Sequence, residues 1–91
     1  MEHAEGKRKK CKVKLYTLST CIWCKKTKKY LDNLGVAYDY IDVDLLPPKE
    51  RAKAEKEMDK WHSDSYPLII VDEKECIRGY EPDEINRRLA S

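Results

Sequence analysis

Two cysteines separated by two residues lie where a strand pattern gives way to a helix pattern. They belong to the segment Cys21-Ile22-Trp23-Cys24. Residues 12–18 alternate and are rich in β-forming side chains, whereas residues 25–34 carry apolar side chains at helical spacing. Ser19 and Thr20 are residue types that cap helices. The sequence therefore predicts that the cysteine pair stands at the end of a strand and the start of a helix.

This placement favours thiol chemistry. A helix start offers free backbone N–H groups and a partial positive charge, and both stabilise a thiolate. We expect Cys21, the outer cysteine, to ionise more readily than Cys24 and to attack a substrate disulfide. Cys24, one helical turn further on, would then attack the mixed disulfide and release the reduced substrate. The pattern predicts thiol–disulfide exchange; a reduced, half-buried pair of cysteines without a redox role is the alternative.

Length and composition predict one small domain. The chain has 91 residues, 41% of them hydrophobic and 40% charged, with a net charge of only +2. This balance gives no reason to expect nucleic-acid binding. No apolar stretch approaches the roughly 20 residues of a membrane span, and the N-terminus lacks the apolar region of a secretory signal. We expect a cytoplasmic protein, in which the four cysteines do not form a structural disulfide framework.

The chain divides into a tail and one folded domain. Residues 1–11 are polar, without periodicity, and contain the basic run Gly6-Lys7-Arg8-Lys9-Lys10, which predicts a flexible basic tail. This tail either keeps the protein soluble or steers an acidic partner by its charge. The domain is expected to span residues 12–91.

Seven elements are predicted within the domain. The expected strands are 12–18, 37–43, 68–71 and 75–78, and the expected helices are 22–34, 49–61 and 83–89. Two parallel strands joined through a helix form a right-handed β-α-β unit. The order β-α-β-α-β-β-α predicts an α/β fold, with a four-stranded mixed sheet flanked by helices.

Three motifs, in this order, resemble the glutaredoxin branch of the thioredoxin fold. They are Cys21-Ile22-Trp23-Cys24, Ser65-Tyr66-Pro67 ahead of an apolar strand, and Gly79-Tyr80-Glu81-Pro82-Asp83-Glu84-Ile85-Asn86-Arg87. The third is similar to a segment of the NrdH-type redoxins, glutaredoxin-like electron donors of ribonucleotide reductase. The resemblance implies an enzyme of cell redox homeostasis, a dithiol–disulfide oxidoreductase that reduces protein disulfides, with ribonucleotide reductase among its expected substrates.

The resemblance also implies roles for residues around the cysteines. It implies a cis peptide bond before Pro67, with the Tyr66 backbone facing Cys21 and pairing with an extended substrate chain. A plain turn proline is the alternative. Trp23 would contact substrate or pack on a neighbouring loop, and Tyr80 would lie beside the site or beneath the last helix. The predicted substrate-binding residues are Trp23, Tyr66, Pro67, Gly79 and Tyr80.

Other residues have less specific roles. Lys25 and Lys26 would either stabilise the thiolate through space or form a solvated basic helix face. Cys76 is expected to be a small buried side chain in an edge strand. Cys11 is expected to be an incidental exposed thiol, with regulatory oxidation or dimerisation as the alternative.

Departures from the family pattern bear on the reductant. Leu18 stands where dithiol glutaredoxins usually carry a lysine that helps hold the glutathione carboxylate. Arg78-Gly79 replaces their Gly-Gly pair, and Pro82 disrupts the acidic pair that follows. Within the NrdH-type subgroup, Arg78 and Glu81 replace Ser and Arg. These departures count against glutathione binding and favour a thioredoxin-reductase-type reductant. We expect a monomer with no bound cofactor, whose redox centre is the Cys21–Cys24 disulfide.

Two other readings stay open. One is a glutathione-dependent glutaredoxin. The other, from a different class, is a metal or iron–sulfur module. Cys21 and Cys24 could complete a four-ligand zinc site with Cys76, Cys11 or His62, although no second close-spaced ligand pair exists. An iron–sulfur cluster would instead use Cys21 and glutathione.

Overall fold

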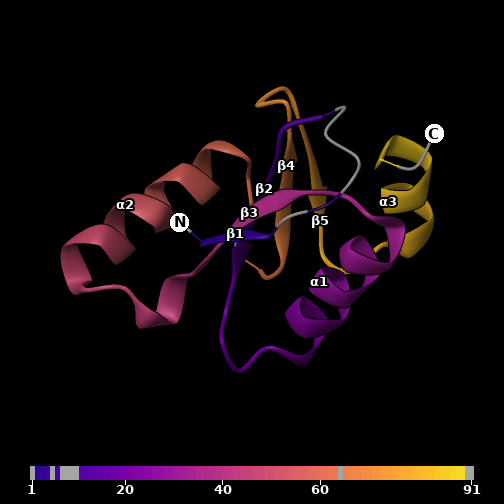
Figure 1. The fold of residues 1–91 in the computed structure, drawn as a ribbon. Coiled ribbons are helices and arrows are strands. Elements are labelled where there is room, and N and C mark those ends of the chain that lie inside the picture. Colours follow the sequence, from indigo (N-terminus) through magenta and orange to yellow (C-terminus); the bar gives the residue numbers. More distant parts are fainter. Residues whose placement is uncertain (1, 5, 7–10, 64, 90–91) are drawn as a thin grey trace.

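A mixed five-stranded sheet forms the centre of the fold (Figure 1). The computed structural model describes residues 2–4, 6, 11–63 and 65–89. The elements are β1 (Glu2–Ala4), β2 (Val13–Thr17), α1 (Ile22–Leu34), β3 (Tyr38–Asp42), the 3-10 helix η1 (Val43–Leu45), α2 (Pro48–Lys60), β4 (Leu68–Val71), β5 (Glu75–Arg78) and α3 (Pro82–Leu89). The strand order across the sheet is β1-β3-β2-β4-β5.

The central strand β2 positions the cysteine segment. It runs parallel to β3 and antiparallel to β4, and Thr17 lies opposite Asp42 in the parallel register. Parallel strands end at the same edge of a sheet, so the last residues of β2 and β3 lie side by side. The chain leaves β2 at this edge and enters α1.

Helices cover both faces of the sheet. Figure 1 shows α1 and α3 on one side of the sheet and α2 on the other. One buried cluster contains apolar residues of the sheet together with Leu31 of α1 and with Ile85 and Leu89 of α3. A second cluster places Ala54 and Met58 of α2 against the opposite face. The strand β4 contributes to both clusters, which explains its uninterrupted apolar sequence.

The prediction of four strands was wrong, because Glu2–Ala4 form β1 rather than part of a tail. β3 would otherwise be an edge strand with unpaired backbone groups, and β1 pairs antiparallel with it. His3 and Asp39 are paired in this register, and their side chains approach to 2.5 Å. Gly6 permits a close approach, because a Cβ there would lie 2.5 Å from the carbonyl carbon of Val36. The basic residues at positions 7–10 lie outside the described residues.

The other predicted elements agree with the structure to within two residues at each end. Gly35 ends α1 in the left-handed conformation, with φ of 73°, and Pro48 opens α2. Among the described residues, no helix is long and apolar enough to cross a membrane.

Candidate active site

The sulfur of Cys21, the first cysteine of the Cys21–Cys24 pair, caps helix α1. Cys21 is the N-cap residue, with extended backbone angles, and the backbone N–H of Cys24 donates to its Sγ at 3.2 Å. The N–H of Cys21 donates to the carbonyl of Leu18 at 3.2 Å, which closes a turn between β2 and α1. The prediction that Ser19 and Thr20 are the capping residues was therefore wrong, because the chain still turns at these positions and α1 begins only after Cys21.

The two cysteines differ in burial. The side chain of Cys24 is fully buried, whereas that of Cys21 is partly exposed, and neither forms a disulfide. Burial, followed by the hydrogen bond with Cys21, raises the pKa of Cys24 to about 12. Cys24 is therefore a neutral thiol at neutral pH. Cys21 is the accessible sulfur of the pair, and it accepts the hydrogen bond from the Cys24 backbone N–H.

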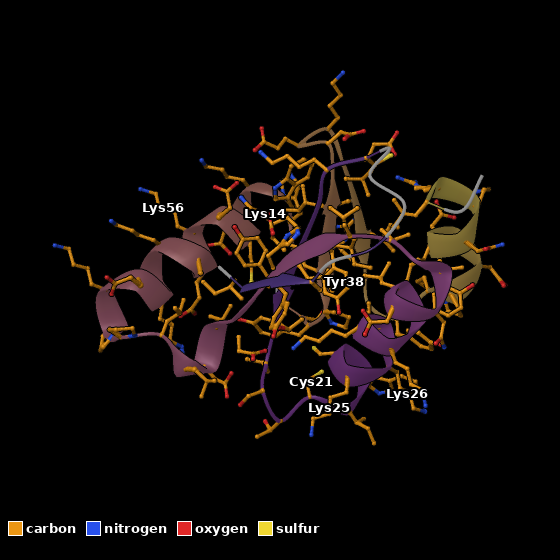
Figure 2. The ribbon with its side chains drawn as sticks, viewed as in Figure 1. Lys14, Cys21, Lys25, Lys26, Tyr38 and Lys56 are labelled. Carbon is orange, nitrogen blue, oxygen red and sulfur yellow. The ribbon has the colours of Figure 1, made fainter. Side chains whose placement is uncertain are left out.

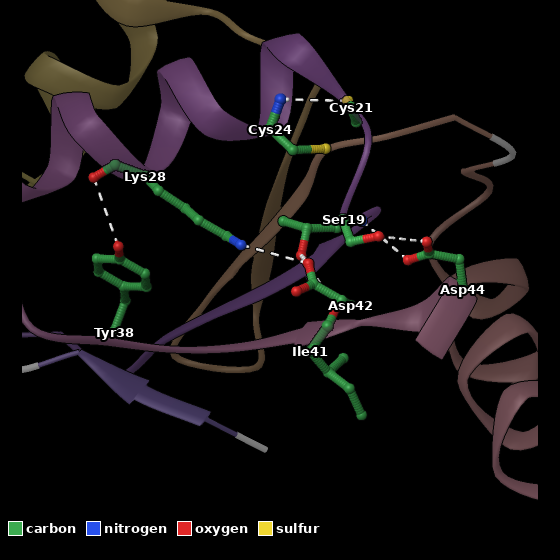
Figure 3. A network of polar contacts seen from close by, with 9 residues as sticks. Ser19, Cys21, Cys24, Lys28, Tyr38, Ile41, Asp42 and Asp44 are labelled. Atoms are coloured by element: carbon green, nitrogen blue, oxygen red, sulfur yellow. Dashed lines mark hydrogen bonds and ion pairs between the residues drawn. The ribbon is translucent and has the colours of Figure 1, made fainter. Parts of the chain in front are cut away.

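A hydrogen-bonded carboxylate holds the loop before the cysteines. The backbone N–H and the hydroxyl of Ser19 both donate to Asp44 of η1, at 2.8 and 2.5 Å (Figure 3). The side-chain and backbone hydrogen bonds from Ser19 lower the pKa of the Asp44 carboxyl. This contact anchors the turn from β2 to α1 on the segment that follows β3.

A lysine and an aspartate form an ion pair behind the cysteines. Nζ of Lys28 lies 3.3 Å from Oδ1 of Asp42, and the two side chains are only 22% and 19% exposed. The hydroxyl of Thr17 donates to the same oxygen of Asp42 at 2.6 Å. Figure 3 shows the Lys28 side chain reaching from α1 to Asp42. Sequence analysis missed this group, although Lys28 lies four residues after Cys24, a spacing that places both on one helix face.

Lys25 and Lys26, the lysines that the sequence singled out, are exposed near the start of α1 (Figure 2). Nζ of Lys26 lies 4.7 Å from the centre of the Trp23 ring, so its structural contact is with the aromatic side chain. That Lys25 and Lys26 stabilise the Cys21 thiolate stays a prediction.

Three aromatic side chains from α1 and the segment after β5 contact one another. The rings of Trp23 and Tyr80 stack with centroids 5.8 Å apart, and Tyr30 meets Tyr80 edge-on at 6.3 Å. Trp23 remains 51% exposed and its neighbour Ile22 is 63% exposed. Tyr80 therefore lies beside the site rather than only beneath α3. Trp23 packs on the segment after β5 and still presents apolar surface to solvent.

The segment before β4 has the backbone geometry that the resemblance implied. The Tyr66–Pro67 peptide bond is cis. Gly79 has φ of +84°, a conformation that favours glycine, and its N–H donates to the carbonyl of Pro67 at 2.8 Å. The Tyr66 side chain is partly buried against the cluster beneath α2. Burial, followed by the charge of Glu55, raises the pKa of the Tyr66 hydroxyl.

The remaining cysteines and the histidine lie elsewhere. Cys76 is in edge strand β5 and is partly buried, with packing against the cluster beneath α2. Cys11 packs against the cluster on the opposite face of the sheet, and His62 is exposed after α2. Within the ranges 2–4, 6, 11–63 and 65–89, no three or more His, Cys, Asp or Glu side chains gather in a group that could hold a metal.

A groove between α2 and the sheet lies away from the cysteines. The groove has a volume of about 530 Å³. Its lining residues are Lys14, Tyr16, Ile41, Leu46, Glu50, Lys53, Ala54 and Glu57. Cys21 and Cys24 do not line this groove.

Known proteins are similar to this chain in sequence and in fold. Residues 13–76 match the sequence profile of the glutaredoxin family. The glutaredoxin of Methanosarcina mazei Go1 is 42% identical with a TM-score of 0.90, the alignment covering 99% of this chain and 87% of that one. The methanoredoxin of Methanosarcina acetivorans is 41% identical, with a TM-score of 0.83 and coverage of 88% and 85%. The NrdH-redoxin of Escherichia coli is 28% identical, with a TM-score of 0.70 and coverage of 84% and 92%.

We expect the stabilising contact between Ser19 and Asp44 to weaken at acidic pH. Because the pKa of Asp44 is lowered in the folded protein, its stabilising effect is present above the ordinary carboxyl pKa and is lost as the pH falls through the lowered value. We expect Asp44→Asn to lower the urea midpoint of unfolding at about pH 7. On acidification to about pH 3 the variant should lose less of its midpoint than the wild type does.

Asp59→Asn is the matched control, since it removes the same charge from the exposed end of α2 without contacting Ser19. An Asp44→Asn variant that loses as much stability on acidification as the wild type would contradict the anchoring role.

Proposed function

The chain belongs to the glutaredoxin family, and we propose that it is a dithiol–disulfide oxidoreductase that reduces protein disulfides. The family and the thioredoxin-like fold agree with the prediction from sequence. One observation carries the proposal: the partly exposed sulfur of Cys21 lies at the start of α1, with the buried thiol of Cys24 directly behind it. This is the arrangement that a two-step exchange requires.

In the first step, the Cys21 thiolate attacks one sulfur of a substrate disulfide. The substrate S–S bond breaks, and the departing sulfur leaves as a thiolate that takes up a proton. In the second step, Cys24 loses its proton and attacks Sγ of Cys21. The mixed disulfide breaks, and the second substrate sulfur leaves and is protonated. The substrate gains two electrons, and Cys21 and Cys24 are left joined as a disulfide.

The surroundings of Cys21 supply a surface for the substrate chain. Ile22 and Trp23 offer exposed apolar area, and Tyr80 supports the Trp23 ring. On the other side, the backbone of Tyr66 and Pro67 is held to Gly79. We propose that these residues bind an extended segment around the substrate disulfide, with Lys25 and Lys26 adding positive charge at the rim.

We further propose that a thioredoxin-reductase-type enzyme, rather than glutathione, returns the electrons. Leu18 occupies the position of the lysine that helps hold glutathione in the resembling glutaredoxins. The Escherichia coli NrdH-redoxin, a structural relative, is described as having a thioredoxin-like activity profile. The proposal includes ribonucleotide reductase among the candidate substrates. It needs no bound cofactor, and it places the protein in the cytoplasm, where reducing equivalents are supplied.

Serine substitutions test the two steps separately. Cys21→Ser should lower the rate of disulfide reduction by more than about a hundredfold, because a hydroxyl does not replace the thiolate nucleophile. In the Cys24→Ser variant, Cys21 should still attack the substrate, but the mixed disulfide at Cys21 should accumulate. Peptide mass mapping after alkylation measures both outcomes.

Cys76→Ser is the matched control and should keep its activity, since Cys76 lies in β5 on the far edge of the sheet. Retained disulfide reduction in Cys21→Ser would contradict the mechanism.

A comparison of reductants tests the electron source. The oxidised protein is mixed either with reduced glutathione or with a thioredoxin-reductase system and NADPH, and the loss of the Cys21–Cys24 disulfide is followed. We expect reduction by the reductase at least about tenfold faster than by millimolar glutathione, since a Leu18 side chain offers glutathione no charge. Rapid reduction by glutathione alone would instead make the protein a glutathione-dependent glutaredoxin.

A further inference from the structure

The second step of the proposed cycle meets an obstacle in the structure. Cys24 must become a thiolate to attack the mixed disulfide. Its side chain has no exposed area, and burial in particular raises its pKa. A buried sulfur can take on negative charge only if nearby groups stabilise that charge.

One lysine is placed to do this. Lys28 follows Cys24 by four residues in α1, so both side chains lie on the helix face that is turned toward the sheet. Burial and then the hydrogen bond with Cys21 raise the pKa of Cys24, whereas the backbone of Leu18 and, to a smaller extent, the positive charge of Lys28 lower it. The neighbouring Lys25, Lys26 and Lys29 are all exposed to solvent, where screening weakens their effect.

Contacts from β2 and β3 hold the Lys28 ammonium in position. Its Nζ lies 3.3 Å from Asp42 and 4.0 Å from the centre of the Tyr40 ring. Asp42 is in turn fixed by the hydroxyl of Thr17, which donates to Asp42 and also to the carbonyl of Ile41. The cation therefore cannot move freely into solvent, as an ordinary surface lysine does.

The other groups around Cys24 come from several elements. Cys21 acts from the N-cap of α1 and Lys28 from within α1, while Tyr66, in the segment before β4, interacts electrostatically with Cys24. Asp42 of β3 is paired with Lys28. The backbone of Leu18, after β2, contributes a hydrogen bond that also lowers the pKa of Cys24. Lys28 is the cationic side chain that acts on Cys24 in this set.

We propose that Lys28, held in place by Asp42, is a positioning residue that stabilises the Cys24 thiolate while it attacks the mixed disulfide. The inference rests on the proposed function, whose second step it refines. During this step Cys24 gives up its proton, its sulfur bonds to Sγ of Cys21, and the bond from Cys21 to the substrate breaks. The leaving substrate thiolate takes up a proton, so no further oxidant or base is required.

A two-stage disulfide reagent tests the proposal. The reduced full chain, with Cys11→Ser and Cys76→Ser to silence the other thiols, is mixed with dithiobis-nitrobenzoate. Attack by Cys21 releases the first coloured thiolate, and resolution by Cys24 releases the second. In Lys28→Met the first release should keep its rate, and the second should slow about threefold to tenfold at neutral pH. The pH profile of the second release should move to higher pH.

Three further variants make the result specific. Lys29→Met removes the same charge from the solvent-facing side and should leave both releases unchanged. Lys28→Arg keeps the charge and should restore the second release. The double variant Lys28→Met/Asp42→Asn leaves no unpaired buried carboxylate, and it should still resolve slowly even if Lys28→Met alone folds poorly.

The outcomes separate this inference from the proposed function. An unchanged second release in Lys28→Met and in Lys28→Met/Asp42→Asn, or an equal slowing of both releases, would overturn the role of Lys28. Equal slowing in Lys29→Met would do the same. A parent protein that releases only one equivalent of the coloured thiolate would refute the two-step cycle itself.

Discussion

The hydrogen bond from the Cys24 N–H to the Cys21 sulfur is the contact on which the rest of the site depends. It starts helix α1 at a cysteine, and it fixes which sulfur faces solvent and which lies against the sheet. A helix start needs acceptors for its free N–H groups, and here the sulfur of Cys21, the proposed nucleophile, is one of them. The turn from β2 holds this geometry through Leu18, and the Ser19–Asp44 pair anchors that turn to η1.

The same arrangement suits the two cysteines to different steps of the proposed disulfide exchange. Exposure and the helix start suit Cys21 to attack, while burial protects Cys24 from side reactions and raises its pKa. In the proposed cycle, the buried thiol of Cys24 must still ionise before it attacks the mixed disulfide. The ion pair between Lys28 and Asp42 lies where it can meet this need, because the parallel register of β2 and β3 places Asp42 beneath the first turns of α1.

Sequence alone predicted those parts of the molecule that local pattern controls. The strand-to-helix junction, the end of α1 at Gly35 and the apolar strand β4 each follow from short-range signals, and the cis bond before Pro67 followed from the resemblance. The missed features depend on which segments meet in space. β1 pairs with an edge that exists only once the sheet has formed, and Lys28 meets Asp42 only through the register of the strands. Neither pairing leaves a local pattern.

Helix α1 sets the two cysteines apart, with Cys21 as the accessible, proposed nucleophile and Cys24 as the buried, proposed resolving thiol. The most direct test is the alkylation rate of each cysteine in the reduced protein, followed by peptide mass mapping at neutral pH with iodoacetamide. The account predicts that Cys21 is modified more than about tenfold faster than Cys24. Equal rates, or faster modification of Cys24, would contradict it.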